Sequence, residues 1–549
     1  MPKHLVNLDA LIVREDLEVT SDAPDKPGSA VANFAVDQLQ EGQNMSGVLR
    51  KPDFQRETVN WTSEQVLELV KNFLDEELIP AIILWKAPNR NVFVIDGAHR
   101  LSALIAWVND DYGDKQLSQA FFGHDNIQRE QKLAAKETRK LIEYEIGGYN
   151  FLRAFIKNPE GATPTQLRRA RNIASVQIVT QSVTNDAAHA EASFYRINQG
   201  GAVIDDSEKE IIQSRSRAEA LSARALLRAG TGHKYWRRFP GTVPTEIESL
   251  AKEIHSLLYK PEVEDEIRTL DLPMAGRGYS GSSLSVLFEF VHIANDLPRE
   301  QKKGRKKDTF EPLPKDDPKK DIDGTTTLKY LNRVKDISEL ITSKEKKSLG
   351  LHPAVYSYSA TGKFQPTAFF AQVELVKRLL RTDGFIDFTR HRARFEDFLV
   401  KYKYFVNQLI GGHGSMTRGL GPLVDLHKLV LDGIGAGRSE DEIKNAALAD
   451  ARFSAHLREI REIPNTNKKG FSSATKAAAR LKSALDYAQR CPICGARLHA
   501  NATSVDHIKR REEGGTSAHS SNAQITHPFC NTGYKEWLVS QAKNQPPST

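Results

Sequence analysis

The sequence predicts an α+β protein of several domains: a mixed N-terminal domain, a mainly helical middle and a small C-terminal domain stabilised by metal. In the N-terminal part, short apolar runs that end in turn residues alternate with amphipathic helical patterns. In the middle, residues 298–324 break the pattern, because Lys, Arg, Asp and Pro replace almost every large apolar side chain. Near the C-terminus lie all three cysteines of the chain, Cys491, Cys494 and Cys530.

The length of 549 residues predicts about three domains. We place them at residues 1–205, 206–465 and 474–549, with 298–324 as an exposed charged loop inside the second. No run of eighteen apolar residues occurs, so no membrane span is expected. The first residues carry charges within their apolar stretch, unlike a signal peptide, which predicts a cytoplasmic protein. Cysteines confined to one metal site also fit a reducing compartment.

The charge distribution favours a polyanionic partner. The formal net charge is +7, and residues 471–549 carry ten Lys or Arg against five Asp or Glu. Such an excess in a short domain is typical of nucleic-acid binding. Solvated basic faces are also common, so the charge supports nucleic-acid binding but is not sufficient evidence for it.

The elements of the first domain follow from local signals. Thr62 and Gln65 form a capping-box pattern before a helix that should run to about residue 78. Residues 80–85 and 91–95 are predicted strands, separated by a turn. The second strand ends in a polar loop that opens the next helix, Asp96-Gly97-Ala98-His99-Arg100.

A strand, a glycine loop and a helix start predict a phosphate site. Gly97 lets the backbone approach an anion, and the free N–H groups of the helix start point at it. Arg100 can add a bidentate contact. His99 can shuttle a proton or only donate a hydrogen bond. The alternative is an ordinary strand-to-helix turn.

Three motifs together resemble a known domain. Gln55-Arg56, then DGAHRLSAL, then Phe194-Tyr-Arg-Ile-Asn198-Gln-Gly-Gly201 are similar to the ParB/sulfiredoxin-like domain of GmrSD-type modification-dependent restriction enzymes and of phosphorothioation-linked Ssp effectors. That family usually shows D-G-Q-Q-R, where this chain has Ala98 and His99. The resemblance implies an α+β fold and a nucleotide- or phosphate-binding site formed by Gln55, Arg56, Asp96, Gly97, His99, Arg100 and Asn198. It leaves open whether the loop hydrolyses a nucleotide, binds one, or grips the DNA backbone.

The C-terminal cysteines predict a structural zinc site. Cys491-x2-Cys494 and His527-x2-Cys530 give a Cys3His set, which suits tetrahedral Zn²⁺. A domain of about 80 residues has a thin core, so a metal adds useful stability. The histidine stands where a cysteine is usual, so His527 either binds zinc or lies free near a phosphate.

The residues between these pairs resemble the HNH (ββα-metal) nuclease motif, in which a zinc ribbon frames a hairpin and a helix. The matching residues are Asp506-His507-Ile508, Gly514-Gly515, Asn522 and Asn531. The resemblance implies that His507 is the general base, that Asp506 and Asn531 hold Mg²⁺ or Mn²⁺, and that Asn522 orients the base. Imidazole titrates near neutral pH, and oxygen ligands suit a hard cation. Lys509, Arg510 and Lys535 are expected to contact DNA. A structural zinc ribbon without catalysis is the alternative.

The two resemblances predict a DNA endonuclease of a type IV-like restriction or anti-phage system. The N-terminal domain would sense a nucleotide or modified phage DNA, with NTPase activity as a further expectation, and would control Mg²⁺-dependent cutting of double-stranded DNA. The alternative is a non-catalytic DNA-binding regulator, although such a protein needs none of Asp506, His507 and Asn531. A homing enzyme ranks lower, because a ParB-like domain has no role there. Double-strand cutting from one site per chain would favour a homo-oligomer.

Overall fold

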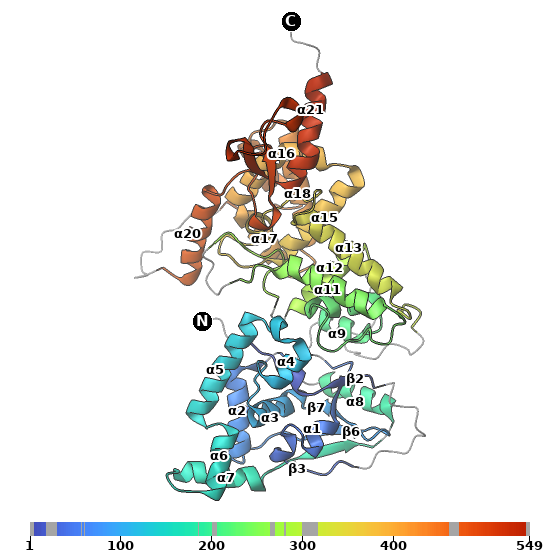
Figure 1. Ribbon diagram of the computed structural model, residues 1–549, viewed down its shortest axis with the longest axis vertical. Helices are drawn as coiled ribbons and strands as arrows, with labels where there is room; N and C mark the ends of the chain where they lie inside the picture. The colour runs from blue at the N-terminus through green and yellow to red at the C-terminus, as the bar shows by residue number, and fades with distance from the viewer. Residues whose placement is uncertain are drawn as a thin grey trace. The chain divides into compact units, whose positions relative to one another are not determined.

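A computed structural model of the chain describes residues 5–17, 30–55, 57–59, 61–184, 186–199, 206–263, 269–278, 282–298, 317–414, 416–459 and 471–544. Helices and strands are both present, which confirms a mixed α and β protein (Figure 1). The chain forms two compact units. The first combines Met1–Lys252, Tyr279–Phe288 and Arg299–Leu328, and the second combines Glu253–Gly278, Glu289–Pro298 and Lys329–Thr549. The predicted domain boundaries at 205 and 465–474 stay predictions.

A mixed five-stranded sheet lies at the centre of the first unit. Its order is β2 (Arg14–Glu15), β4 (Leu49–Pro52), β7 (Val92–Asp96), β6 (Ile82–Lys86) and β9 (Thr180–Val183). The central strands β6 and β7 run antiparallel, while the β2–β4, β4–β7 and β6–β9 pairs are parallel. Both central strands match the predicted ones within two residues, and β7 ends at Asp96.

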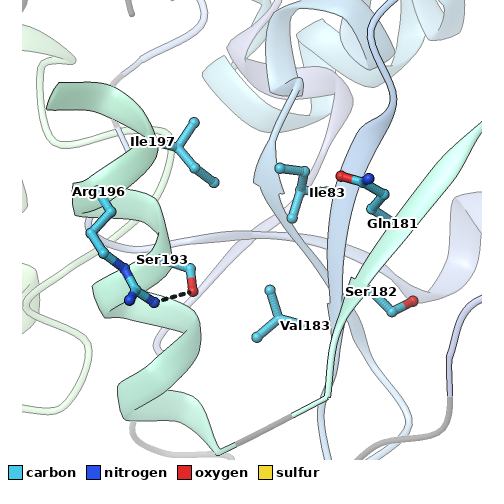
Figure 2. Close-up of a pocket in the computed structure, with 7 residues that line it drawn as sticks. All are labelled: Ile83, Gln181, Ser182, Val183, Ser193, Arg196 and Ile197. Atoms are coloured by element: carbon cyan, nitrogen blue, oxygen red, sulfur yellow. Dashed lines mark hydrogen bonds between the residues drawn. The ribbon is translucent and has the colours of Figure 1, made fainter. Parts of the chain in front are cut away.

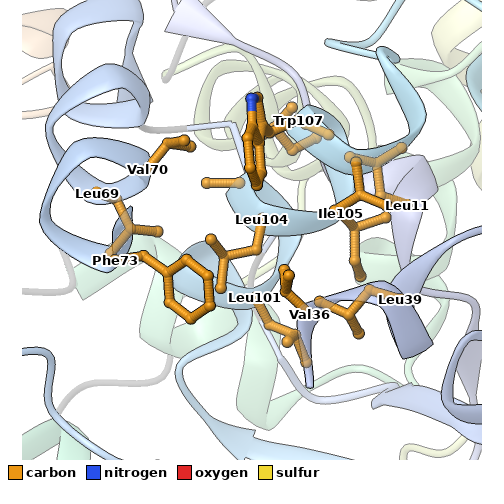
Figure 3. Packing of buried hydrophobic residues seen from close by; sticks show 14 of the residues in the cluster. Leu11, Val36, Leu39, Leu69, Val70, Phe73, Leu101, Leu104, Ile105 and Trp107 are labelled. Carbon is orange, nitrogen blue, oxygen red and sulfur yellow. The ribbon is translucent and has the colours of Figure 1, made fainter. Parts of the chain in front are cut away.

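Alternating side chains of the central strands face two separate cores. Leu84, Val92 and Val94 pack against α2 (Ser63–Leu74) and α3 (Ala98–Asn109). Figure 3 shows Leu104 of α3 beside Phe73 of α2 in this core. The intervening residues Trp85, Phe93 and Ile95 pack on the other face against α8 (Ala187–Gln199). The period-two pattern therefore places helices on both faces of the sheet.

The start of α2 confirms the predicted capping box. The Thr62 hydroxyl accepts from the Gln65 backbone N–H, and the Gln65 side chain accepts from the Thr62 backbone N–H. The apolar face of the helix is buried as its spacing predicts, and comprises Val66, Leu69, Val70 and Phe73. The helix ends at Leu74, with Asp75 as its C-cap, four residues before the predicted end.

Further helices complete the first unit: α1 (Asn44–Val48), α4 (Gln116–Phe122), α5 (Arg129–Glu145), α6 (Tyr149–Lys157), α7 (Pro164–Ser175), α9 (Asp206–Gln213) and α10 (Ala218–Leu227). Short antiparallel pairs join β1 (Leu5–Val6) to β5 (Trp61–Thr62) and β3 (Phe34–Ala35) to β8 (Gln177–Ile178). Of the charged segment 298–324, residues 299–316 lie outside the described residues. Its end is held by an ion pair of Asp317 with Arg217 and by buried Asp321.

The second unit is mainly helical up to its C-terminal part. Its helices include α13 (Thr325–Ile341), α14 (Pro353–Tyr356), α15 (Pro366–Thr382), α16 (Phe385–Lys401), α17 (Lys403–His413), α18 (Leu420–Gly435), α19 (Glu440–Ala449) and α20 (Ser473–Asp486). Helix α13 begins in the first unit, and two more helices, α11 (Val243–Tyr259) and α12 (Ser283–Ala294), likewise extend from the first unit into the second. Among the described residues, no helix is both long and apolar enough to cross a membrane.

The chain ends in a hairpin followed by a helix. Strands β10 (Ser504–His507) and β11 (Ala523–Thr526) are antiparallel, with Asp506 opposite Gln524 and His507 opposite Ala523. A π-helical turn, η8 (Cys530–Tyr534), leads directly into α21 (Lys535–Asn544). This order of elements places Asp506 and His507 on β10, Asn522 directly before β11, and Asn531 in η8.

Candidate functional site

The predicted zinc ligands come together. Metal-binding atoms of Cys491, Cys494, His527 and Cys530 all lie within 4.8 Å of one another. The Nδ1 atom of His527 lies 3.4 Å from Cys494 Sγ and 3.7 Å from Cys530 Sγ. Its Nε2–H donates to the Arg497 carbonyl at 3.0 Å, which leaves the Nδ1 lone pair directed at the sulfurs. Burial lowers the pKa of His527, so the ring is held neutral, as a metal ligand must be. The set fits zinc.

The local fold explains this convergence. Cys491 donates its N–H to Ala496 O, and Gly495 donates to Cys491 O, which closes a tight turn between the first two cysteines. Gly495 has a φ of +75°, a conformation that favours glycine. The second pair lies where β11 ends and η8 begins. A small apolar cluster surrounds the sulfurs, with Leu498, Ile493 and Ile525.

Helix α16 supports the metal cluster through residues that the sequence did not identify. Arg392 is buried; it donates to Glu396 at 2.7 Å and to Gly350 O at 2.9 Å. Glu396 also accepts the Arg497 N–H at 3.0 Å. Asp397 accepts from the Arg497 guanidinium at 2.7 Å. Arg497 in turn carries the carbonyl that orients His527, so the helix and the zinc ligands form one hydrogen-bonded assembly.

The hairpin of β10 and β11 buries the carboxylate of Asp506. Asp506 is 5% exposed. Both of its oxygens accept from Lys535 Nζ at 2.8 Å, and one accepts from Gln524 Nε2 at 2.8 Å. Lys535 donates also to the His507 carbonyl. The Lys535 ammonium bonds both oxygens of the buried Asp506 carboxylate. The carboxylate therefore already binds one cationic group of the chain.

The other three predicted hydrolytic residues contact different parts of the hairpin. Asn531 donates to Ser504 Oγ at 2.8 Å and to Val505 O at 3.3 Å, so it lies against β10 beside the Asp506 strand position. His507 Nε2 lies 2.8 Å from Ser517 Oγ. Asn522 bonds the loop backbone rather than the imidazole. The structure thus brings Asp506, Asn531 and Lys535 to the seam between β10 and the terminal helix, while the His507 ring faces the loop.

The basic residues expected at DNA have distinct surroundings. Lys509 lies in the exposed loop after β10, and Arg510 pairs with Glu536 and Glu512. Lys535 pairs with Asp506. Sequence reasoning missed Ser517 and Gln524. Neither carried a signal in the sequence, because the register opposite Asp506 and the path of the loop are set by how the hairpin closes.

In the first unit, the predicted phosphate loop borders a cavity of about 210 Å³. It is lined by Gln55, Trp61, Ile95, Asp96, Gly97, Ala98, His99, Arg100 and Phe194. Gly97 has a φ of +92°, and a Cβ there would lie 2.6 Å from Ile82 Cδ1. Arg100 donates to Pro80 O at 2.6 Å and pairs with Asp96. The loop therefore needs glycine, and its arginine is already engaged by oxygens of the chain.

The side chain of Gln55 is bonded to the backbone of β7. Its Nε2 donates to Val94 O at 2.9 Å and to Ile95 O at 3.2 Å, which settles the orientation of the amide. The buried Oε1 has no hydrogen-bond partner among the described residues. Arg56 lies outside the described residues, and so does the side chain of Asn198, although its backbone belongs to α8.

A buried ionic cluster holds the segment that carries Gln55. Asp9 Oδ1 accepts from Lys51 Nζ at 2.6 Å, Arg14 Nη2 at 2.9 Å and the Thr58 N–H at 3.1 Å. Arg14 also donates to Pro52 O at 3.1 Å. Burial alone would raise the pKa of Asp9, but the charges of Lys51 and Arg14 outweigh burial and lower it. The segment is thus anchored at both ends.

A second cavity of about 420 Å³ lies between α8 and strands β6 and β9. Figure 2 shows Arg196 and Ser193 on α8 and Ile83 and Val183 on the strands. Arg196 is exposed and donates to Ser193 Oγ at 3.2 Å. One helix therefore borders this cavity and also contributes Phe194 to the cavity at the Gly97 loop.

The comparison with protein families adds one finding. Residues 36–215 match the family described as "GmrSD restriction endonuclease, N-terminal domain". The matched segment contains every residue that lines the cavity at the Gly97 loop. No curated protein and no solved structure matches the chain. The family match supports a GmrSD-type restriction nuclease that acts on DNA.

Proposed function

We propose that the chain is a DNA endonuclease of a prokaryotic restriction or anti-phage system, in which an HNH site hydrolyses phosphodiesters with Mg²⁺. The observation that carries the proposal is the buried carboxylate of Asp506, on a hairpin that contacts Asn531 and whose second strand leads directly into the Cys3His cluster. A carboxylate that neutralises Lys535 is unfavourable in a module that only binds DNA, because its negative charge opposes phosphate.

Each residue has a role in this proposal. Asp506 and Asn531 would hold Mg²⁺, whose charge would stabilise the developing negative charge on the phosphate. His507 takes a proton from water, the resulting hydroxide forms a new bond to phosphorus, and the bond to the leaving oxygen breaks. The leaving oxygen takes a proton from solvent. Lys509, Arg510 and Lys535 would contact the DNA backbone, and zinc would hold the hairpin in place.

The N-terminal domain would control this site by sensing a nucleotide or modified phage DNA. Its cavity at the Gly97 loop supports binding of a small polar group, because a helix start and a glycine meet there. Nucleotide hydrolysis is a further proposal for the same loop. Cleavage of modified and unmodified DNA, each with the four nucleoside triphosphates, would identify the signal.

The test of the nuclease assignment is Mg²⁺-dependent cleavage of supercoiled DNA by His507→Ala. We expect a loss of roughly 10²–10⁴-fold, the usual contribution of a general base. His519→Ala is the matched control, because His519 is an exposed histidine of the same hairpin loop. Equal cleavage by His507→Ala and wild type would refute the assignment. DNA binding without Mg²⁺-dependent cleavage would instead favour the regulator.

A further inference from the structure

We propose that Ser517 is the residue that positions His507 for hydrolysis, by fixing Nε2 of the imidazole so that Nδ1 faces the attacking water. The inference deepens the proposed nuclease function and rests on it. Ser517 would act through His507 and would not itself touch the substrate.

The contact that carries the inference is direct. Ser517 Oγ lies 2.8 Å from His507 Nε2. The same oxygen accepts from Arg511 at 2.9 Å through Nη2 and at 3.2 Å through Nε. A hydroxyl oxygen has two lone pairs: the forked N–H groups of Arg511 can share one, and the imidazole N–H can take the other. Ser517 is thus held by a second group while it holds the ring.

The loop around Ser517 is built to keep it there. Asn522 accepts from the Lys509 N–H at 2.7 Å and donates to Lys509 O at 3.0 Å and Thr516 O at 2.9 Å. The bonds with Lys509 join the two ends of the loop. The bond with Thr516 fixes the residue directly before Ser517. Gly515 allows the tight path, because a Cβ there would lie 1.9 Å from Lys509 O. Asn522 therefore orients the imidazole indirectly, through the backbone that carries Ser517.

The proposal assigns one form to the ring, in which Nε2 carries the proton. With Nε2–H donating to Ser517, the neutral imidazole keeps its lone pair on Nδ1, which is the atom that must take the proton from water. Without the hydroxyl, the ring can rotate and exchange its tautomers, and only part of the population is ready to act as a base. Neighbouring groups that orient an active residue usually contribute about 10–100-fold.

The first experiment compares Ser517→Ala, Ser517→Thr and Ser520→Ala as full-length, zinc-loaded proteins. Ser520 is an exposed serine of the same loop and serves as the matched control. We expect Ser517→Ala to lower kcat by 10–100-fold with KM within twofold of wild type. Ser517→Thr keeps the hydroxyl and should restore most of kcat, and Ser520→Ala should match wild type. Equal kcat for Ser517→Ala and wild type would overturn the inference.

The second experiment measures the tautomer without Mg²⁺ or DNA. Nitrogen NMR shifts of histidine-labelled protein distinguish a protonated from an unprotonated ring nitrogen, and His507→Ala identifies the signal of His507. We expect wild type to carry its proton on Nε2, and Ser517→Ala to show a mixture. A proton on Nδ1 in wild type, or identical spectra for the two proteins, would overturn the inference. If wild-type protein fails to cut DNA with Mg²⁺, the nuclease proposal itself falls, whatever the tautomer.

Discussion

Lys535 combines two properties that a phosphate-binding lysine at the protein surface lacks. Its ammonium contacts both oxygens of Asp506 and the carbonyl of His507, and only 16% of its side chain is exposed. In the proposed site, Mg²⁺ at Asp506 would therefore compete with an internal cation. The lysine keeps the buried carboxylate compensated before metal binds, because an unpaired buried charge is costly.

Replacing this lysine should make Mg²⁺ binding easier. We expect Lys535→Gln to lower the Mg²⁺ concentration for half-maximal cleavage by about 3–10-fold, because loss of a partly exposed ion pair is worth about 1 kcal/mol. The measurement is a Mg²⁺ titration of cleavage at saturating DNA, which removes any effect on DNA affinity. Lys543→Gln, on the same terminal helix, is the control. An unchanged or raised Mg²⁺ requirement would show that Lys535 does not compete with the metal.

At the scale of residues, the sequence was sufficient to name candidate site residues but not the residues that they contact. The order of Asp506, His507 and Asn531 was sufficient to name candidates, because residue types at fixed spacing indicate chemistry. The contacts of Lys535 with Asp506 and of Ser517 with His507 join residues 29 and 10 positions apart. Such contacts depend on the path of the hairpin loop, which composition does not specify.

At the scale of elements, α16 connects the helical part of the second unit to the zinc cluster. Its residues Arg392 and Glu396 form a buried pair at 2.7 Å, and Glu396 also binds the backbone of Arg497. In sequence these charges look like a solvated helix face at a spacing of four residues. The structure buries them, because the carbonyl groups of residues 349 and 350 and the hydroxyl of Tyr356 complete their hydrogen bonds.

Breaking that pair should destabilise the second unit. We expect Glu396→Ala to lower the free energy of unfolding by about 3–5 kcal/mol, because Arg392 would remain buried without its carboxylate. Asp387→Ala is the matched control on the same helix, where the carboxylate is 73% exposed and its ion-pair distances are 3.6 and 3.8 Å. That control should change stability by less than about 1 kcal/mol. Denaturant unfolding measures both, and equal effects would refute the structural role of the pair.

His427 on α18 predicts a dependence of stability on pH. Burial lowers its pKa to about 4, and its Nδ1 has no hydrogen-bond partner among the described residues. The unfolded chain binds the proton near pH 6.5, so stability is full above that pH and falls as the pH drops toward 4. The contribution at stake is about 3 kcal/mol. His427→Leu should lose less stability than wild type between pH 7 and pH 5 in denaturant melts; identical losses would contradict this.

Elements with strong local signals could be predicted, and elements set by long-range contacts could not. The capping box at Thr62 and the alternation around residues 91–95 fix a helix start and a strand locally. The five-stranded order depends on parallel pairing of β6 with β9, nearly 100 residues apart, which no local pattern encodes. The register that places Gln524 opposite Asp506 likewise depends on how the hairpin closes.

At the scale of the whole molecule, the Cys3His cluster is bonded to residues outside its own ribbon. Phe529 donates its N–H to Ser348 O at 3.0 Å, and Thr532 donates to Lys346 O at 2.7 Å. Together with Arg497 and α16, these bonds tie the metal-binding turns to the helical part of the second unit. The hairpin is therefore part of a larger assembly and is not an independent appendage.

Removing the metal should therefore loosen a defined set of segments. We expect a strong chelator to release one zinc per chain and to raise hydrogen exchange in residues 346–350 and α16 as well as in the ribbon. The sheet of the first unit should keep its protection. Cys494→Ser should reproduce the effect without chelator. Loss of protection confined to residues 491–530 would show that the ribbon folds independently.

Helix α8 contributes residues to two cavities of the first unit. Phe194 lines one cavity of the unit, and Arg196, two positions along, lines another. A small rotation of this helix would therefore change the shape of both cavities. Binding of ligands in the two cavities would then be coupled. A ligand in one cavity would change the affinity of the other cavity for its ligand, by the same factor in each direction. Titrating either compound alone would miss this linkage, whereas paired titrations would reveal it.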